Sequence, residues 1–203
     1  MDIVLASASP RRRELLTTAG LTFSVLTADT DESIPAGTHP DDAVSLLAER
    51  KAAAVKEKYN IDDGTLIIAA DTVVYHNGNI LGKPKDEADA KRMLTSLSGS
   101  EHSVSTGIAL SYGGKTVSES VSTVIRFREL SEKEIDLYIK TGEPMDKAGG
   151  YGIQVKASMF VTGISGDYFA TVGLPVCRLM TLAKEAFDID LSICALGGKT
   201  DTE

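Results

Sequence analysis

Hydroxyl and basic side chains are concentrated near the N-terminus, in the segment LASASPRRR at residues 5–13. A proline is favoured in the first turn of a helix, so we expect a helix to begin there with Ser9 as its N-cap. Arginines at a helix N-terminus oppose the helix dipole and cost roughly 0.3–1 kcal/mol each unless an anion is bound. Together with backbone N–H groups, they are typical of a phosphate site, although solvated arginines on a surface helix are the alternative. The candidate phosphate ligands in this segment are Ser7, Ser9, Arg11 and Arg12.

A carboxylate interrupts the most strand-like run of the sequence, TLIIAADTVVY at residues 65–75. Burial of Asp71 among these apolar residues is costly unless the carboxylate is paired, binds a metal or takes part in catalysis. The alternative is an aspartate at a strand end that accepts backbone hydrogen bonds. Glu32, in the acidic loop DTDES at residues 29–33, is the candidate second carboxylate, although such a loop can also be merely solvated. Two carboxylates suit Mg²⁺ when water and phosphates complete the ligand set, so Glu32 and Asp71 are the candidate metal ligands.

Two lysines and a glutamine complete the candidate binding residues. Lys51 shares the apolar stripe of an expected long helix, so its ammonium either extends to solvent or points into a cleft. Lys83 lies in a Gly-Lys-Pro turn that fixes the direction of its side chain, although such loops are common. Gln154 ends the glycine loop KAGGYGIQ and could pair with a base edge, or the loop could simply lead into the next strand. Cations, carboxylates and a glycine loop together suggest a nucleotide phosphate site.

The elements that must position these residues alternate between helices and strands. This mixture of crossovers and hairpins indicates an α/β fold with a mixed sheet, and a capping box at residues 131–134 predicts one of the helix starts. Helices are expected over about 11–19, 41–58, 87–97, 131–140 and 175–187, and strands over 2–6, 22–27, 65–75, 80–81, 102–112, 115–128 and 160–164. We expect a single domain over residues 1–190 and a polar C-terminal tail over residues 191–203.

Composition limits the class of protein. With 203 residues, a net charge of −8 and a sequence pI near 5.0, the chain is a poor binder of nucleic acid polymers, whose phosphates favour a basic face. No apolar run is long enough to span a membrane, and the N-terminus lacks the features of a signal peptide, so we expect a cytoplasmic protein. The two cysteines do not form a disulfide framework, and we expect Cys177 to be a core thiol. The three histidines show no ligand spacing and suggest no chemistry.

Six segments resemble motifs of the Maf family of nucleoside triphosphate pyrophosphatases, first named as septum formation inhibitors. They follow one another in unbroken order over about residues 2–187. The segments are S-x-S-P-R-R after the first strand, E-R-K-A at 49–52, A-A-D-T at 69–72, L-G-K-P at 81–84, E-P-x-D-K-A-G-x-Y-G-I-Q at 143–154 and G-D-Y…G-L-P at 166–175.

This resemblance implies metal-dependent hydrolysis of a nucleoside triphosphate to its monophosphate and pyrophosphate, with Mg²⁺ or Mn²⁺ as the cofactor. It implies that Asp71 is the proton acceptor. Arg11, Thr72 and Gln154 match the specificity positions of the branch that acts on dTTP and UTP. The implied fold is an elongated α/β structure with two lobes around a central cleft, similar to inosine triphosphate pyrophosphatases and often dimeric. The alternative function is a nucleotide-binding regulator of cell division with little hydrolytic activity.

Overall fold

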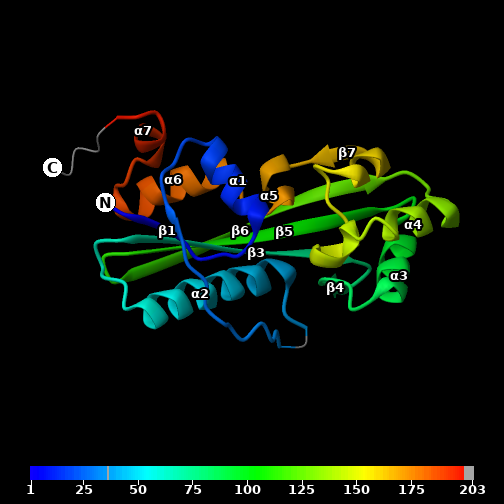
Figure 1. The fold of residues 1–203 in the computed structure, drawn as a ribbon, viewed down its shortest axis with the longest axis horizontal. Helices are drawn as coiled ribbons and strands as arrows, with labels where there is room; N and C mark the ends of the chain where they lie inside the picture. Colours follow the sequence, from blue (N-terminus) through cyan, green and yellow to red (C-terminus); the bar gives the residue numbers. More distant parts are fainter. Residues whose placement is uncertain (36, 199–203) are drawn as a thin grey trace. The chain divides into compact units, whose positions relative to one another are not determined.

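The computed structural model describes residues 1–35 and 37–198 of the chain (Figure 1). These residues divide into two compact units, and each is described by itself. Unit 1 comprises Met1–Asp71, Thr106–Val121 and Gly173–Glu203, and unit 2 comprises Thr72–Ser105 and Ser122–Val172.

Among the described residues, seven strands form one mixed sheet in the order β2-β1-β3-β5-β6-β7, with β4 paired to β3. Strand β1 runs parallel to β2 and β3, whereas β4 and β7 are antiparallel to their neighbours β3 and β6. The strands are β1 (Ile3–Leu5), β2 (Ser24–Val25), β3 (Leu66–His76), β4 (Asn79–Leu81), β5 (Glu101–Tyr112), β6 (Lys115–Phe127) and β7 (Val161–Ser165). The prediction of a mixed α/β sheet is therefore confirmed, whereas the elongated outline and central cleft stay predictions.

Most helices begin where the sequence predicts them. The capping box is present, because the Ser131 hydroxyl accepts from the Glu134 N–H and the Glu134 carboxylate accepts from the Ser131 N–H. Unit 1 contains α1 (Pro10–Thr18), α2 (Pro40–Tyr59), α6 (Val176–Phe187) and α7 (Leu191–Ala195). Unit 2 contains α3 (Glu87–Leu97), α4 (Glu132–Ile139), α5 (Tyr168–Val172) and the short 3₁₀ helices η1 (Glu143–Asp146), η2 (Ala148–Gly150) and η3 (Lys156–Phe160).

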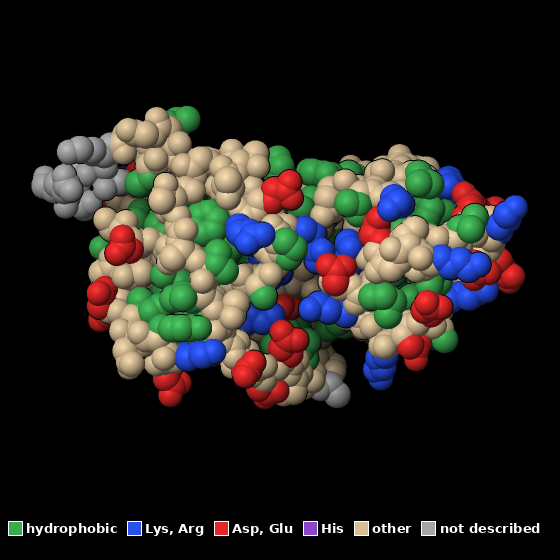
Figure 2. All heavy atoms as spheres, viewed as in Figure 1, with side chains coloured by type: hydrophobic (Ala, Val, Ile, Leu, Met, Phe, Trp, Pro, Cys, Tyr) green, Lys and Arg blue, Asp and Glu red, His purple; other side chains and the backbone are tan. Residues whose placement is uncertain are grey.

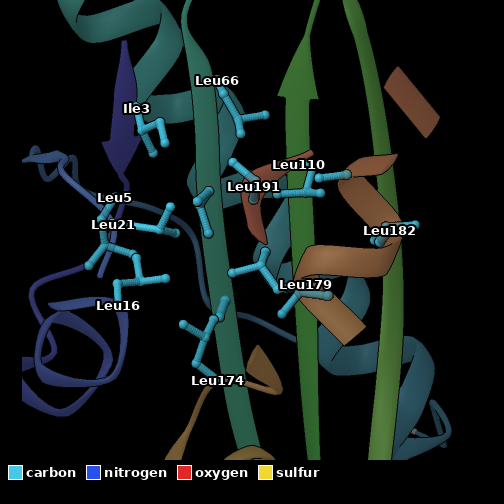
Figure 3. Packing of buried hydrophobic residues seen from close by; sticks show 14 of the residues in the cluster. Ile3, Leu5, Leu16, Leu21, Leu66, Leu110, Leu174, Leu179, Leu182 and Leu191 are labelled. Atoms are coloured by element: carbon cyan, nitrogen blue, oxygen red, sulfur yellow. The ribbon is translucent and has the colours of Figure 1, made fainter. Parts of the chain in front are cut away.

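Strand β1 and the part of β3 that belongs to unit 1 are buried on both faces. Leu5 and Ile68 pack on one face against apolar side chains of α1, α6 and α7 (Figure 3). Val4 and Ile67 pack on the opposite face against the small side chains of α2. Successive side chains of a strand point to opposite faces, so this double covering accounts for the nearly continuous apolar sequence of β3.

A glycine in β5 sets how closely α2 approaches the sheet. A Cβ atom at Gly107 would lie 2.3 Å from the backbone carbonyl carbon and oxygen of Val44 in α2. Only a residue without a side chain permits this contact. Gly107 therefore fixes the position of the helix that carries Lys51.

Unit 2 has an aromatic core. The rings of His102, Phe127 and Tyr151 meet edge to face, with centroids 4.8–5.4 Å apart, and Phe160 extends the cluster from Phe127. The Tyr151 hydroxyl lies 2.7 Å from His102 Nε2. His102 therefore lies near the start of β5, as predicted, and belongs to a packed core.

Two expectations from the sequence are wrong. Cys177 is exposed rather than a core thiol, because it lies two residues from the buried Leu179 and so faces away from the buried side of α6. The polar tail does not begin at residue 191, because Leu191–Ala195 form α7 and Leu191 is fully buried. Residues 199–203 of that expected tail lie outside the described residues, and the single-domain assignment stays a prediction.

Candidate active site

Asp71 lies in β3, directly after the buried run Leu66–Ala70. Its neighbour β1 pairs with β3 only as far as Leu5, which is opposite Ile68, and the chain then continues toward α1. Asp71 therefore lies beyond the carboxyl end of β1. Its side chain is only 14% exposed, so its carboxylate needs a partner.

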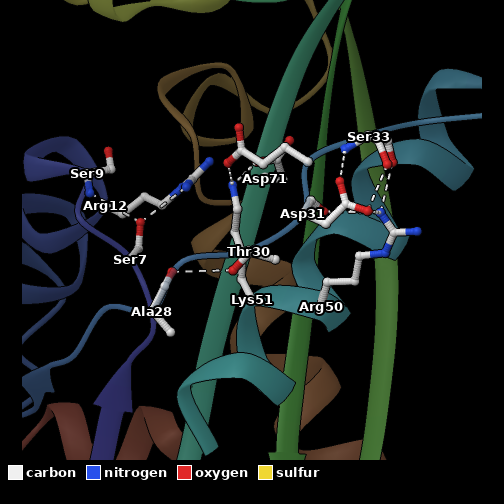
Figure 4. Close-up of polar contacts among 11 residues, drawn as sticks. Ser7, Ser9, Arg12, Ala28, Thr30, Asp31, Ser33, Arg50, Lys51 and Asp71 are labelled. Atoms are coloured by element: carbon white, nitrogen blue, oxygen red, sulfur yellow. Dashed lines mark hydrogen bonds and ion pairs between the residues drawn. The ribbon is translucent and has the colours of Figure 1, made fainter. Parts of the chain in front are cut away.

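That partner is Lys51 of α2. Its Nζ forms an ion pair with the Asp71 carboxylate and lies 2.9 Å from Oε1 of Glu32 (Figure 4). The Lys51 side chain is 18% exposed, so its ammonium does not extend freely into solvent. A loop, a helix and a strand thus bring three charged side chains together, as the candidate site requires.

Arg12 adds a second cation to the same part of unit 1. Its side chain is buried, its Nε donates to the carbonyl of Gly173 at 2.8 Å, and its Nη1 donates to the Ser7 hydroxyl at 3.2 Å. Burial lowers the pKa of Arg12 from its usual value, and the negative charge of Asp71 is the main influence that opposes this shift. In Figure 4 the guanidinium extends from α1 toward Asp71. The alternative of a solvated surface arginine is therefore wrong for Arg12.

The serines at the start of α1 are arranged differently from the simple N-cap that we expected. Ser9 occupies the N-cap position, but its side chain makes no capping hydrogen bond. The Ser7 hydroxyl instead accepts from the Ser9 N–H at 3.2 Å and from Arg12. Arg11 follows in the first turn of α1 and is half-buried. Hydroxyl, guanidinium and helix N–H groups are therefore gathered at one helix start, which is an arrangement that suits a phosphate.

The two carboxylates fit the requirements of a small divalent cation. Glu32 and Asp71 both reach a single positive charge, the ammonium of Lys51, so they can also share a metal ion. Residues 1–35 and 37–198 contain no group of three or more His, Cys, Asp or Glu side chains that could hold a metal. Water and substrate phosphates would have to complete the ligand set, and Mg²⁺ is usually bound in this way.

The remaining predicted site residues belong to unit 2. Thr72 follows Asp71 in β3, and Lys83 and Gln154 are exposed. The Gly149 N–H donates to the carbonyl of Gly82 at 3.0 Å, which brings the glycine loop beside the residue that precedes Lys83. Within unit 2 the two candidate loops are therefore neighbours.

Sequence reasoning missed Arg50, which precedes Lys51 in α2. Its Nη1 donates to the carbonyls of Asp31 and Ser33, which flank Glu32 in the chain. The only available signal was its place in the E-R-K-A segment, since a contact across 17 or 19 residues leaves no periodic pattern.

The chain is similar to known proteins over most of its length. The family model described as Maf-like protein matches residues 2–186. A Bacillus cereus (strain AH187) protein named dTTP/UTP pyrophosphatase is 49% identical over 190 residues, which cover 94% of this chain and 97% of the relative. A Bacillus cytotoxicus protein of the same name is 49% identical over 182 residues, which cover 90% and 94% of the two chains.

Solved structures give a more distant likeness. The Staphylococcus aureus Ham1 protein is 14% identical with a TM-score of 0.44, and the match covers 63% of this chain and 72% of that one. A Mycobacterium abscessus nucleoside-triphosphatase, also named dITP/XTP pyrophosphatase, is 13% identical with a TM-score of 0.39, and the match covers 63% and 74% of the two chains.

Proposed function

The chain belongs to the Maf-like family, and from this membership we propose that it hydrolyses dTTP or UTP to the nucleoside monophosphate and pyrophosphate. The observation that carries the proposal is the 49% identity, over 94% of this chain, to a relative named dTTP/UTP pyrophosphatase. The arrangement of charged side chains in unit 1 is consistent with it. Phosphoryl transfer depends mainly on positioning and electrostatic stabilisation, and both basic and acidic groups are gathered there.

In this proposal Asp71 is the general base. It accepts a proton from the water that attacks the α-phosphorus, and the apolar strand around it keeps the carboxylate in a fixed direction. Lys51, Arg11 and Arg12 then stabilise negative charge on the departing pyrophosphate. Support for these roles comes from the short distances among Glu32, Lys51 and Asp71 and from the burial of Arg12.

We further propose that Glu32 and Asp71 hold a divalent cation, Mg²⁺ or Mn²⁺. A bound cation of this kind neutralises phosphate charge and makes a bound water more acidic. Lys51 would then exchange its carboxylate partners for a phosphate oxygen. The hydroxyls of Ser7 and Ser9 would donate to phosphate oxygens beside the N–H groups of α1.

The residues of unit 2 take their proposed roles from the family resemblance. Lys83 is proposed as a phosphate ligand. Thr72 and Gln154, with Arg11 of unit 1, are proposed to select the pyrimidine nucleotide. The amide of Gln154 offers both a donor and an acceptor, which is what recognition of a base edge requires.

Release of pyrophosphate from the four ribonucleoside and four deoxyribonucleoside triphosphates tests this function. We expect dTTP and UTP to be hydrolysed fastest with Mg²⁺ or Mn²⁺ and the reaction to stop when EDTA removes the metal. Faster hydrolysis of purine nucleotides would contradict the substrate class. Tight binding of nucleotides without release of pyrophosphate would instead favour a regulatory protein.

A small dissolved substrate also suggests the setting in which the protein acts. No helix of the described residues is long and apolar enough to cross a membrane. On the face drawn in Figure 2, acidic side chains lie among the basic ones, an arrangement poorly suited to a nucleic acid polymer.

We propose a cytoplasmic homodimer, and exposed apolar side chains of unit 2 such as Met159, Ile164 and Phe169 offer a surface for the second copy. Cell fractionation and light scattering test these two points.

A further inference from the structure

The loop that carries Glu32 is held by a side chain from α2. Nη1 of Arg50 donates hydrogen bonds to the carbonyl oxygens of Asp31, at 3.1 Å, and Ser33, at 2.8 Å. The same nitrogen lies 3.9 Å from the Asp31 carboxylate (Figure 4). Arg50 thus binds the backbone on both sides of Glu32. We propose that Arg50 is a positioning residue that holds the Glu32 carboxylate beside Lys51 and Asp71.

Glu32 is the most exposed of the three charged side chains, so support from its surroundings matters most for it. Its side chain is 63% exposed and belongs to a loop rather than to a helix or strand. Asp31 shapes the loop locally, since its carboxylate accepts from the Ser33 N–H at 2.9 Å and from the Ser33 hydroxyl at 2.8 Å. These bonds lie within the loop. The two carbonyl contacts of Arg50 tie this turn to α2.

Arg50 and Lys51 are consecutive residues of α2, and they bind different parts of the Glu32 loop. Lys51 binds the Glu32 carboxylate, and Arg50 binds the backbone that presents it. A guanidinium carries five N–H donors in a rigid planar fork, so it can bind two carbonyl oxygens at once with little loss of freedom. A lysine at position 50 has a compact ammonium and cannot reproduce this geometry.

The consequence concerns metal affinity and rests on the proposed function, in which Glu32 and Asp71 hold the cation. Residues that orient a metal ligand typically contribute a factor of 10–100 to metal affinity, and we expect Arg50→Met to weaken Mn²⁺ binding about tenfold, at the low end of this range. Arg50 should act only through Glu32. Its effect should therefore vanish when the Glu32 carboxylate is removed.

The first measurement is amide hydrogen exchange of residues 30–34, which needs neither metal nor substrate. We expect faster exchange in Arg50→Met than in the wild type, and an intermediate rate in Arg50→Lys. Lys56→Met is the matched control, since Lys56 lies on the same helix and pairs with Asp63 at 2.6 Å, away from the loop. Circular dichroism identifies any variant that fails to fold. If Arg50→Met fails to fold, Arg50→Lys replaces it in the exchange measurement.

The second measurement is Mn²⁺ titration of the full chain, followed by electron paramagnetic resonance and water-proton relaxation. The proteins are the wild type, Arg50→Met, Glu32→Gln, the double variant of these two, Asp71→Asn and the control Lys56→Met. We expect both Arg50→Met and Glu32→Gln to bind Mn²⁺ more weakly and the double variant to bind as weakly as Glu32→Gln. Lys56→Met should bind like the wild type.

Three results separate this inference from the function on which it rests. Unchanged exchange at residues 30–34 in the Arg50 variants would overturn the positioning role, whatever the metal does. The positioning role would also be overturned if the double variant bound Mn²⁺ more weakly than Glu32→Gln, by the loss seen in Arg50→Met alone. Arg50 would then affect metal binding without acting through Glu32. Wild-type Mn²⁺ affinity in both Glu32→Gln and Asp71→Asn would instead refute the proposed metal ligands and leave the exchange result to decide the role of Arg50.

Discussion

Charged side chains around Asp71 are paired with one another or with backbone carbonyls. Lys51 joins the carboxylates of Glu32 and Asp71, and buried Arg12 binds the carbonyl of Gly173. A charge taken out of water is tolerated only when it is paired in this way.

His102 shows the opposite solution, in which a buried titratable residue stays neutral. Burial lowers its pKa to about 3, and the nearby His76 contributes to the shift. Its Nδ1 is buried and has no hydrogen-bond partner among the described residues. The folded protein therefore does not protonate this ring near neutral pH, whereas the unfolded chain does so below about pH 6.5.

We predict that His102 makes the folded state lose stability as the pH falls below 6.5. The unfolded state binds the extra proton, so the free energy of unfolding should fall by about 2 kcal/mol between pH 6.5 and 5, and further toward pH 3. Urea unfolding at several pH values measures this change. His102→Gln should be less stable at pH 7 but should lose less on acidification.

His39→Gln is the matched control, because the His39 side chain is 65% exposed. We expect it to follow the pH dependence of the wild type. If His102→Gln lost as much stability on acidification as the wild type, groups other than His102 would cause the loss.

At the scale of elements, α2 carries both Arg50 and Lys51, and its approach to β5 depends on a single glycine. A side chain at position 107 would meet the backbone of Val44, which cannot move without shifting the helix. A shift of α2 would move Lys51 and would therefore change its contact with Asp71.

We predict that Gly107→Ala destabilises the protein by about 1–3 kcal/mol or more, the usual cost of overpacking a core. Activity should fall as well, because α2 moves. Gly163→Ala is the control, since a Cβ there would approach nothing closer than 3.6 Å, and its effect should stay within about 0.5 kcal/mol. The two variants are compared by denaturant unfolding, and equal stability would contradict the account of α2.

Patterns in the sequence predicted the elements better than the contacts between them. Alternation and capping signals gave the strands of the sheet, the start of α2 at Pro40 and the capping box of α4. They could not give the bond from Arg12 to Gly173, which joins residues 161 positions apart, or the contacts of Arg50. The exposure of Cys177 was missed because the side of α6 that is buried depends on what packs against it.

At the scale of the whole chain, the proposed general base is the residue at which the first sequence segment of unit 1 ends. Asp71 is the last residue of the first segment of unit 1, and Thr72 is the first residue of unit 2. One strand, β3, thus carries the carboxylate of one unit and a proposed specificity residue of the other. In the proposed function, hydrolysis of dTTP or UTP depends most directly on residue 71.

The turnover of Asp71→Asn on dTTP and UTP tests this claim most directly. Asparagine keeps the shape of the side chain but cannot accept the proton, so kcat should fall about 100-fold or more, which is typical for loss of a general base. Circular dichroism should match that of the wild type. Pyrophosphate release at a rate near that of the wild type, from a correctly folded Asp71→Asn protein, would contradict the account.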